Sequence, residues 1–210
     1  MIEEVLTQEK IDLFHKIYNR ANDRFKPYVL LENNSYGFVG WFLKIKIRKS
    51  IKELKTCLDI IPNHINSMFG IGKCYQSLGE DMESLEWFEK GLQINFSQLS
   101  YEEDEAKYKI LINYCLLEAS VIAAKKNDFA KAVNYSERIL ESEPQNISVL
   151  GNLAMNFIIT EKDIEAKKTI VRALSISPSD TINNDINKFL TKLKDGVITR
   201  PKAWNDFKFS

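Results

Sequence analysis

The chain has 210 residues, of which 44% are apolar and 11% aromatic, so it can form one sizeable domain or two small ones. Its 29 basic and 29 acidic side chains cancel, which excludes a net charge that would draw the whole molecule to nucleic acid or to an acidic membrane. Eight glycines and five prolines are few, and this favours a helical protein over a turn-rich β protein.

Neither a secretory signal nor a membrane span is expected. The first residues, MIEEVLTQEK, are acidic where a signal peptide would be basic, and no apolar core of roughly 7–15 residues follows. No stretch approaches the ~18 consecutive apolar residues that a membrane helix needs. Cys57, Cys74 and Cys115 lack the spacing of a metal or disulfide site, so we expect reduced, buried thiols and a cytoplasmic protein.

The N-terminal part, residues 1–49, is interpreted as a helical segment with a divergent first repeat. Its first helix is expected over residues 7–25, with one apolar side made of Ile11, Phe14, Ile17, Tyr18 and Ala21. The stretch SIKELKTCLDIIPNH, which begins at Ser50, has the pattern of the second helix of a hairpin that ends at Pro62. Residues 36–43, where its first helix is expected, do not fit the pattern.

Three segments then share one pattern, over residues 65–98, 113–146 and 147–180. They align when Gly79, Asn127 and Glu161 are given the same turn position. Apolar residues recur at spacings of three and four in each half, which predicts two amphipathic helices per segment. Small residues recur where paired helices must approach closely: Gly72, Ser120 and Ala154 in the first helices, and Ser84, Ala132 and Ala166 in the second.

This pattern resembles the tetratricopeptide repeat, a 34-residue helix–turn–helix unit with a large residue, Leu-Gly, Tyr, Ala, an aromatic, and a final Ala-Leu before Pro. The first segment offers Met68, Ile71-Gly72, Tyr75, Ser84, Phe88 and Gly91-Leu92. The third offers Leu150, Leu153-Ala154, Phe157, Ala166, Ile170, Ala173-Leu174 and Pro178. Two departures are Phe96 in place of Pro, and Ser120 and Ala123 in place of Gly and Tyr. The resemblance implies an all-α fold in which repeats over residues 50–180 form a right-handed superhelical stack.

Two further segments complete the chain. A capping box at Ser100 and Glu103 predicts that the helix of the second segment begins near Tyr101 and runs to Lys125. Residues 181–210 are assigned to a capping helix over residues 181–194 and an aromatic tail.

The tail carries Trp204, Phe207 and Phe209 close to one end of the chain, where polar disorder is usual. Three arrangements remain open from the sequence. The tail seals the last helix by covering Phe189 and Leu193, or it enters an apolar groove of its own or a neighbouring chain, or it is disordered.

No enzymatic signature is found, and no cofactor or metal is expected. His15 and His64 are the only histidines, and each is interpreted as a surface or packed residue rather than a general base. The GIG at residues 70–72 lies inside a predicted helix and is no phosphate loop. The acidic run at residues 102–105 is interpreted as a solvated helix start.

The resemblance implies a partner groove lined by the second, fifth and ninth positions of each repeat. In this chain those residues are Asn66, Phe69 and Lys73, then Tyr114, Leu117 and Val121, then Ser148, Gly151 and Met155. They form an apolar floor with few polar points, and an apolar floor implies a partner or self-coverage. Relatives that grip a C-terminal carboxylate use several cations, whereas here Lys73 stands alone and Glu118 would repel the ligand.

A basic stripe at helical spacing consists of Lys44, Arg48, Lys52 and Lys55. It is either the solvated flank of an amphipathic helix or a dock for an acidic peptide or a phosphate backbone.

From these features we expect a non-enzymatic protein–protein interaction module, an adaptor, scaffold or chaperone-like protein. It would bind an apolar or amphipathic segment of another protein in its concave groove. The alternative is a self-assembling structural protein whose groove is buried in a homodimer. An RNA-binding helical-repeat protein that uses the basic stripe is a third hypothesis.

Overall fold

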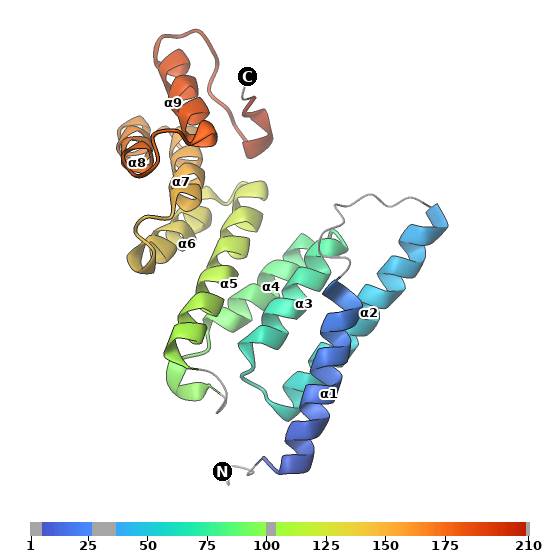
Figure 1. Ribbon diagram of the computed structural model, residues 1–210. Coiled ribbons are helices and arrows are strands. Elements are labelled where there is room, and N and C mark those ends of the chain that lie inside the picture. The colour runs from blue at the N-terminus through green and yellow to red at the C-terminus, as the bar shows by residue number, and fades with distance from the viewer. Residues whose placement is uncertain (1–5, 27–36, 100–103, 209–210) are drawn as a thin grey trace. The chain divides into compact units, whose positions relative to one another are not determined.

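The computed structural model describes residues 6–26, 37–99 and 104–208, with side chains of the second range from residue 40 onward (Figure 1). Every regular element in these ranges is helical, which confirms the predicted all-α class. The helices are α1 (Gln8–Phe25), α2 (Gly37–Ile60), α3 (Ile65–Ser77), α4 (Asp81–Leu92), α5 (Glu105–Lys125), α6 (Phe129–Ser142), α7 (Ile147–Ile159), α8 (Asp163–Ile176) and α9 (Thr181–Lys194). Short 3₁₀ turns lie at Phe96–Gln98 and Trp204–Asp206.

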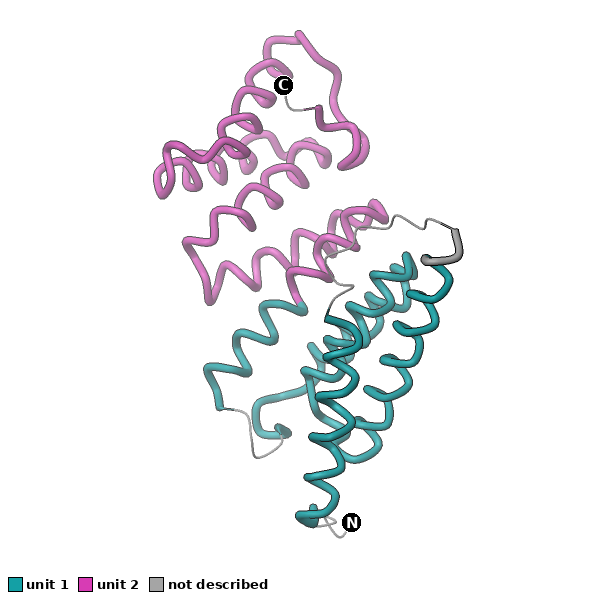
Figure 2. The backbone as a smooth tube through the Cα atoms, turned by 45° about the vertical axis from the view of Figure 1, so that its right-hand side comes forward, with its two compact units in different colours: residues 1–115 teal, residues 116–210 magenta. Residues whose placement is uncertain are grey.

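The chain separates into two compact units, residues 1–115 and 116–210, whose boundary falls within α5 (Figure 2). Unit 1 contains α1 to α4 and the first part of α5, and unit 2 contains the remainder. The three segments predicted from the sequence, residues 1–49, 50–180 and 181–210, were defined by where the repeat pattern begins and ends, whereas the two units are defined by packing. The predicted division therefore stays a prediction.

The turn that joins the two helices of each repeat has the same backbone geometry in all three repeats. Gly79, Asn127 and Glu161 have φ angles of +77°, +62° and +62°. The residue after each of them donates its backbone N–H to a carbonyl near the end of the preceding helix. These bonds run from Glu80 to Tyr75, from Asp128 to Ala123 and from Lys162 to Phe157, with N···O distances of 3.0, 2.9 and 2.8 Å. This left-handed closure ends a helix by satisfying its last carbonyls. The alignment made on these turn residues is therefore confirmed.

Small residues bring the paired helices of unit 1 close together. A Cβ added to Gly72 of α3 would lie 2.5 Å from the ring of Phe88 on α4, so only glycine admits the ring there. The Ser84 hydroxyl donates to the Gly72 carbonyl at 2.8 Å and is itself buried. Phe88 is consequently buried completely.

The N-terminal hairpin differs from the prediction. The helix that was expected to begin near Ser50 is part of a single helix, α2, and its partner is α1 rather than residues 36–43. The chain has no Pro between residues 28 and 61, so nothing interrupts α2. The Ser50 hydroxyl donates to the Ala21 carbonyl at 3.2 Å, and Arg20 and Arg24 both pair with Glu53, which fixes α1 on α2.

The first helix of the second repeat begins later than Tyr101, where it was predicted to start, because α5 starts at Glu105 and Asp104 accepts the Lys107 backbone N–H at 2.7 Å as its cap. The capping box at Ser100 and Glu103 lies outside the described residues.

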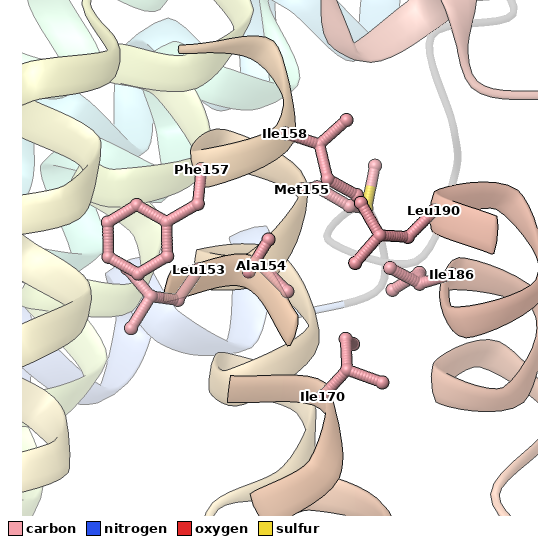
Figure 3. Packing of buried hydrophobic residues seen from close by; sticks show 9 residues of the cluster. Leu153, Ala154, Met155, Phe157, Ile158, Ile170, Ile186 and Leu190 are labelled. Carbon is pink, nitrogen blue, oxygen red and sulfur yellow. The ribbon is translucent and has the colours of Figure 1, made fainter. Parts of the chain in front are cut away.

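Unit 2 has its core where α7, α8 and α9 meet. Figure 3 shows Ile186 and Leu190 of α9 directed toward Met155 and Ile158 of α7. The helix α9 has the predicted bounds, and Asp180 caps it by accepting the Asn183 backbone N–H.

The three cysteines are buried thiols, as expected. Burial raises the pKa of the Cys57 thiol to about 11 and raises that of Cys74 as well. Among the described residues, no cluster of three or more potential metal ligands occurs, and no helix has the length and apolarity that a bilayer crossing requires.

Substituting Ala166 by Leu tests the repeat packing. Ala166 is fully buried in the core of unit 2, so the larger side chain should overpack the contact and lower the free energy of unfolding by about 1–3 kcal/mol. Lys168→Leu is the control, because Lys168 is exposed on the same helix and its replacement should change stability by less than about 0.5 kcal/mol. Urea unfolding followed by circular dichroism measures both, and an equal effect of the two substitutions would contradict this packing.

Thiol accessibility tests the burial of the cysteines. At about pH 8 the native chain should react with a thiol reagent only as fast as it opens, because all three thiols are buried and the raised pKa values of Cys57 and Cys74 leave these two with little thiolate. In guanidinium chloride all three cysteines should react at once. Rapid labelling of any of them in the native chain would mean that the helices around it are packed differently.

Candidate protein-interaction surfaces

An exposed aromatic surface lies on unit 1 and is formed by Phe69 of α3 and Tyr114 of α5. Phe88, buried against Gly72, supports the half-buried Phe69, with ring centroids 5.5 Å apart. The rings of Phe69 and Tyr114 are 6.0 Å apart, and Tyr114 remains 51% exposed. The contacting rings form an apolar surface, and aromatic side chains, with few rotatable bonds, lose little entropy when a ligand covers them.

The edge of this aromatic surface is polar. Lys73 lies one turn after Phe69 on α3, and its ammonium donates to the side-chain carbonyl of Gln76. Asn66, one turn before Phe69, is half-buried. The arrangement offers aromatic contact together with a single cation.

The predicted groove residues of the second and third repeats differ in accessibility. Leu117 and Val121 follow Tyr114 along α5 and are half-buried, and Ser148 of α7 is exposed. Gly151 and Met155 of α7 are buried. The predicted set is therefore accessible on α3 and α5, whereas two of its three members on α7 are not.

The helix α9 explains this burial. A Cβ on Gly151 would lie 2.9 Å from the Asn183 side-chain oxygen and 3.5 Å from Ile186, so α9 lies directly on this glycine. Met155 is 9% exposed and packs in the cluster that contains Ile186 and Leu190 (Figure 3). This chain thus covers the third-repeat part of the predicted floor with its own helix.

The basic stripe on α2 is exposed along its length, but two of its four cations have partners within unit 1. Arg48 pairs with Glu80, the residue that follows the turn of the first full repeat. The Lys55 ammonium lies 5.4 Å from the Trp87 ring centroid and 3.4 Å from the Tyr75 hydroxyl. Lys44 and Lys52 are exposed.

The C-terminal tail is attached to unit 2 by an arginine. Arg200 donates to both carboxylate oxygens of Asp163, at 2.7 and 2.8 Å, and to the Ile158 carbonyl at 2.6 Å. The hydrogen bonds that Arg200 donates to the carboxylate lower the pKa of Asp163 below its ordinary value of 3.8. The stabilisation from this pair is therefore present above the ordinary pKa and is lost as the pH falls through the lower, folded-state value.

The tail is also attached to unit 2 by the indole of Trp204. Trp204 packs against Ala123, Ala124 and Ala132, and its ring N–H donates to the Asn156 side-chain oxygen at 2.7 Å. Asn156 is only 1% exposed. Its side-chain nitrogen has no hydrogen-bond partner in the structure.

Three arrangements of the tail were left open by the sequence. Phe207 follows the first of them, in which the tail covers the last helix, because its ring lies 4.9 Å from that of Phe189 on α9. Trp204 and Arg200 instead contact helices other than α9: Trp204 packs on α5 and α6, and Arg200 binds α7 and α8. Phe209 lies outside the described residues. The polar partners of the tail, Asn156 and Asp163, were not predicted, although a lone amide within the apolar run LAMNFII was a signal that could have found Asn156.

Comparisons with known proteins agree with this architecture. A family model described as the tetratricopeptide repeat matches residues 65–98. Protein O-mannosyl-transferase TMTC3 of Homo sapiens is 22% identical over 223 aligned positions, which cover 95% of this chain and 24% of that protein. This chain therefore spans about a quarter of the length of that relative.

Two solved structures are also similar. One is described as MamA RS-1 ArsTM double mutant, with a TM-score of 0.64, 14% identity and coverage of 91% of this chain and 88% of that one. It has the same helical-repeat fold. The other, described as YrrB, a TPR protein with an unusual peptide-binding site, has a TM-score of 0.35, 12% identity and coverage of 81% and 97%, respectively.

Replacing Arg200 by Met tests how the tail is held. The substitution removes three hydrogen bonds, so trypsin should cleave after Lys202 several-fold faster than in the wild-type chain. Arg172→Met is the matched control, because Arg172 also donates to a backbone carbonyl, that of Pro144, without touching the tail. Cleavage is followed by mass spectrometry. An equal rate in Arg200→Met and the wild type would show that the arginine does not hold the tail.

Proposed function

We propose that this chain, which is a tetratricopeptide repeat protein, is a non-enzymatic interaction module that binds an apolar or amphipathic segment of another protein on its aromatic surface. Repeat proteins of this kind present extended surfaces to other proteins or peptides. An adaptor or scaffold role follows from such binding. The buried cysteines, whose spacing in the sequence suits no disulfide framework, support a cytoplasmic location.

The observation that carries this proposal is the pair formed by Phe69 and Tyr114. Tyrosine is enriched at interfaces because one side chain offers a large apolar area and a polar end. Tyr114 is half exposed and yet supported from below by Phe69, which Phe88 supports in turn. Lys73 at the edge favours a ligand with an acidic or hydrogen-bonding group beside its apolar residues.

The position of His64 supports a non-enzymatic role. His64 accepts the Ser67 backbone N–H at 3.1 Å as the N-cap of α3 and is buried, so it is engaged in holding the fold. The transferase activity in the name of the human relative belongs to a protein of which this chain matches 24%, and we do not extend it to this chain.

Selection of peptides from a random display library tests the proposal. Peptides that bind the wild-type chain should be rich in aromatic and aliphatic residues, and Tyr114→Glu should weaken their binding about tenfold or more, because the new charge has no partner on an apolar surface. Val171→Glu is the control, because Val171 on α8 is also a large apolar residue, 54% exposed. Circular dichroism checks that both variants fold.

Two outcomes would contradict the proposal. Equal binding of the selected peptides to wild type and Tyr114→Glu would exclude the aromatic surface as the site. A wild-type dimer that Tyr114→Glu converts to a monomer, seen by light scattering, would favour the self-assembling structural protein instead.

A further inference from the structure

A second candidate site belongs to unit 2 and is the one that the tail occupies. We define this tail site by the Asn156 side chain, the Asp163 carboxylate, the Ile158 carbonyl and three alanines, Ala123, Ala124 and Ala132. We propose that the tail site recognises a partner-protein segment that carries an arginine and, four residues later, a tryptophan. In the free chain Arg200 and Trp204 occupy it as an intramolecular competitor.

The arginine half of the tail site is specific for a guanidinium. The two Asp163 oxygens receive two different nitrogens of Arg200, at 2.7 and 2.8 Å, in the paired geometry that lysine cannot provide. The Ile158 carbonyl, in the last turn of α7, accepts a third hydrogen bond at 2.6 Å. Asp163 lies in the first turn of α8, where the helix dipole favours its negative charge.

The tryptophan half selects a large ring with an N–H group. The three alanines project no side chain beyond Cβ, so they leave room for an indole against α5 and α6. Asn156 then accepts the indole N–H at 2.7 Å. Phenylalanine has no donor to offer this buried oxygen, and a tyrosine hydroxyl lies at a different place on its ring.

The side-chain nitrogen of Asn156 indicates which occupant the site fits. It is buried and has no acceptor while the tail is bound, and a buried donor without a partner destabilises that state. The tail of a second copy would bring the same atoms and leave the same donor unsatisfied. A different segment that places a carbonyl at this nitrogen would satisfy the whole amide, so we assign the site to a partner protein rather than to a second copy.

The tail competes because it is tethered. Residues 195–199 connect it to α9 through Gly196, whose φ of +70° turns the chain back. A short tether gives an effective concentration in the millimolar range, so a partner must bind more tightly than the tail or must bind after the tail is weakened.

The test uses a fluorescent peptide with the sequence of residues 199–208 and the full chain. The peptide should bind the Arg200→Met/Trp204→Ala double variant, whose site is intact but released, about tenfold or more tightly than the wild-type chain. Peptides in which the tryptophan is replaced by alanine, or the arginine by lysine, should bind the double variant about tenfold or more weakly. Adding Asn156→Ala to the double variant should weaken binding in the same way.

Controls separate this inference from the proposed function. Tyr114→Glu, added to the double variant, should leave peptide binding unchanged, since Tyr114 takes no part in the tail site. Trp204→Phe alone keeps an aromatic ring on the alanines and removes only the donor, so it serves if the double variant does not fold. The peptide should bind this variant more tightly than the wild type.

Three results would overturn the inference. Equal affinity for the wild type and for folded released variants would place the peptide elsewhere. If the released variants keep the wild-type circular dichroism but do not bind the peptide, the tail only covers the core of unit 2 and the tail site binds no partner. A dimer that light scattering shows to depend on Trp204 would assign the site to a second copy.

Discussion

The close approach of α3 and α4 at Gly72 is the contact on which the aromatic surface depends. A methyl group at this position would lie 2.5 Å from the Phe88 ring, so glycine lets the ring fill the space between the two helices. Phe88 then supports Phe69, and Phe69 supports Tyr114. A packing contact within one hairpin thus holds an exposed tyrosine in a defined place, which links the repeat pattern of the sequence to the proposed interaction.

Unit 2 has the same hairpin geometry, but here the chain itself covers two of the predicted groove residues of α7. Its helix α9 packs on α7 and covers Gly151 and Met155, and its tail adds Trp204 and Arg200. Apolar surface at the end of a repeat array must be covered, and here the chain itself supplies the cover. The tail differs from α9 because it is held through the hydrogen bonds of Arg200 and Trp204 and through the Trp204 and Phe207 rings, contacts that a competing segment of similar chemistry could replace.

The repeats were predictable because their signals are local. Helical spacing of apolar residues located α3 to α9, and the shared left-handed turn at Gly79, Asn127 and Glu161 made the segments align even though only the first has glycine there. The helix α1 has nearly the predicted bounds, whereas the start of α2 and its pairing with α1 were not predicted, because residues 36–43 do not follow the repeat pattern.

The candidate sites were less predictable because they depend on contacts between distant residues. Asn156 and Trp204 are 48 positions apart, and no local sequence pattern indicates that the two residues form a hydrogen bond. The spacing placed Gly151 and Met155 on the same face as Ser148, but only the position of α9 decides which of them remain accessible.

Photo-crosslinking from inside the cell tests the central claim most directly. A photoreactive phenylalanine is placed at position 114, on the aromatic surface, or at position 171 as the exposed control on α8. The account predicts a covalent adduct with a distinct protein from position 114 and none from position 171. The absence of an adduct at position 114, an adduct only with a second copy of this chain, or the same adduct from both positions would contradict it.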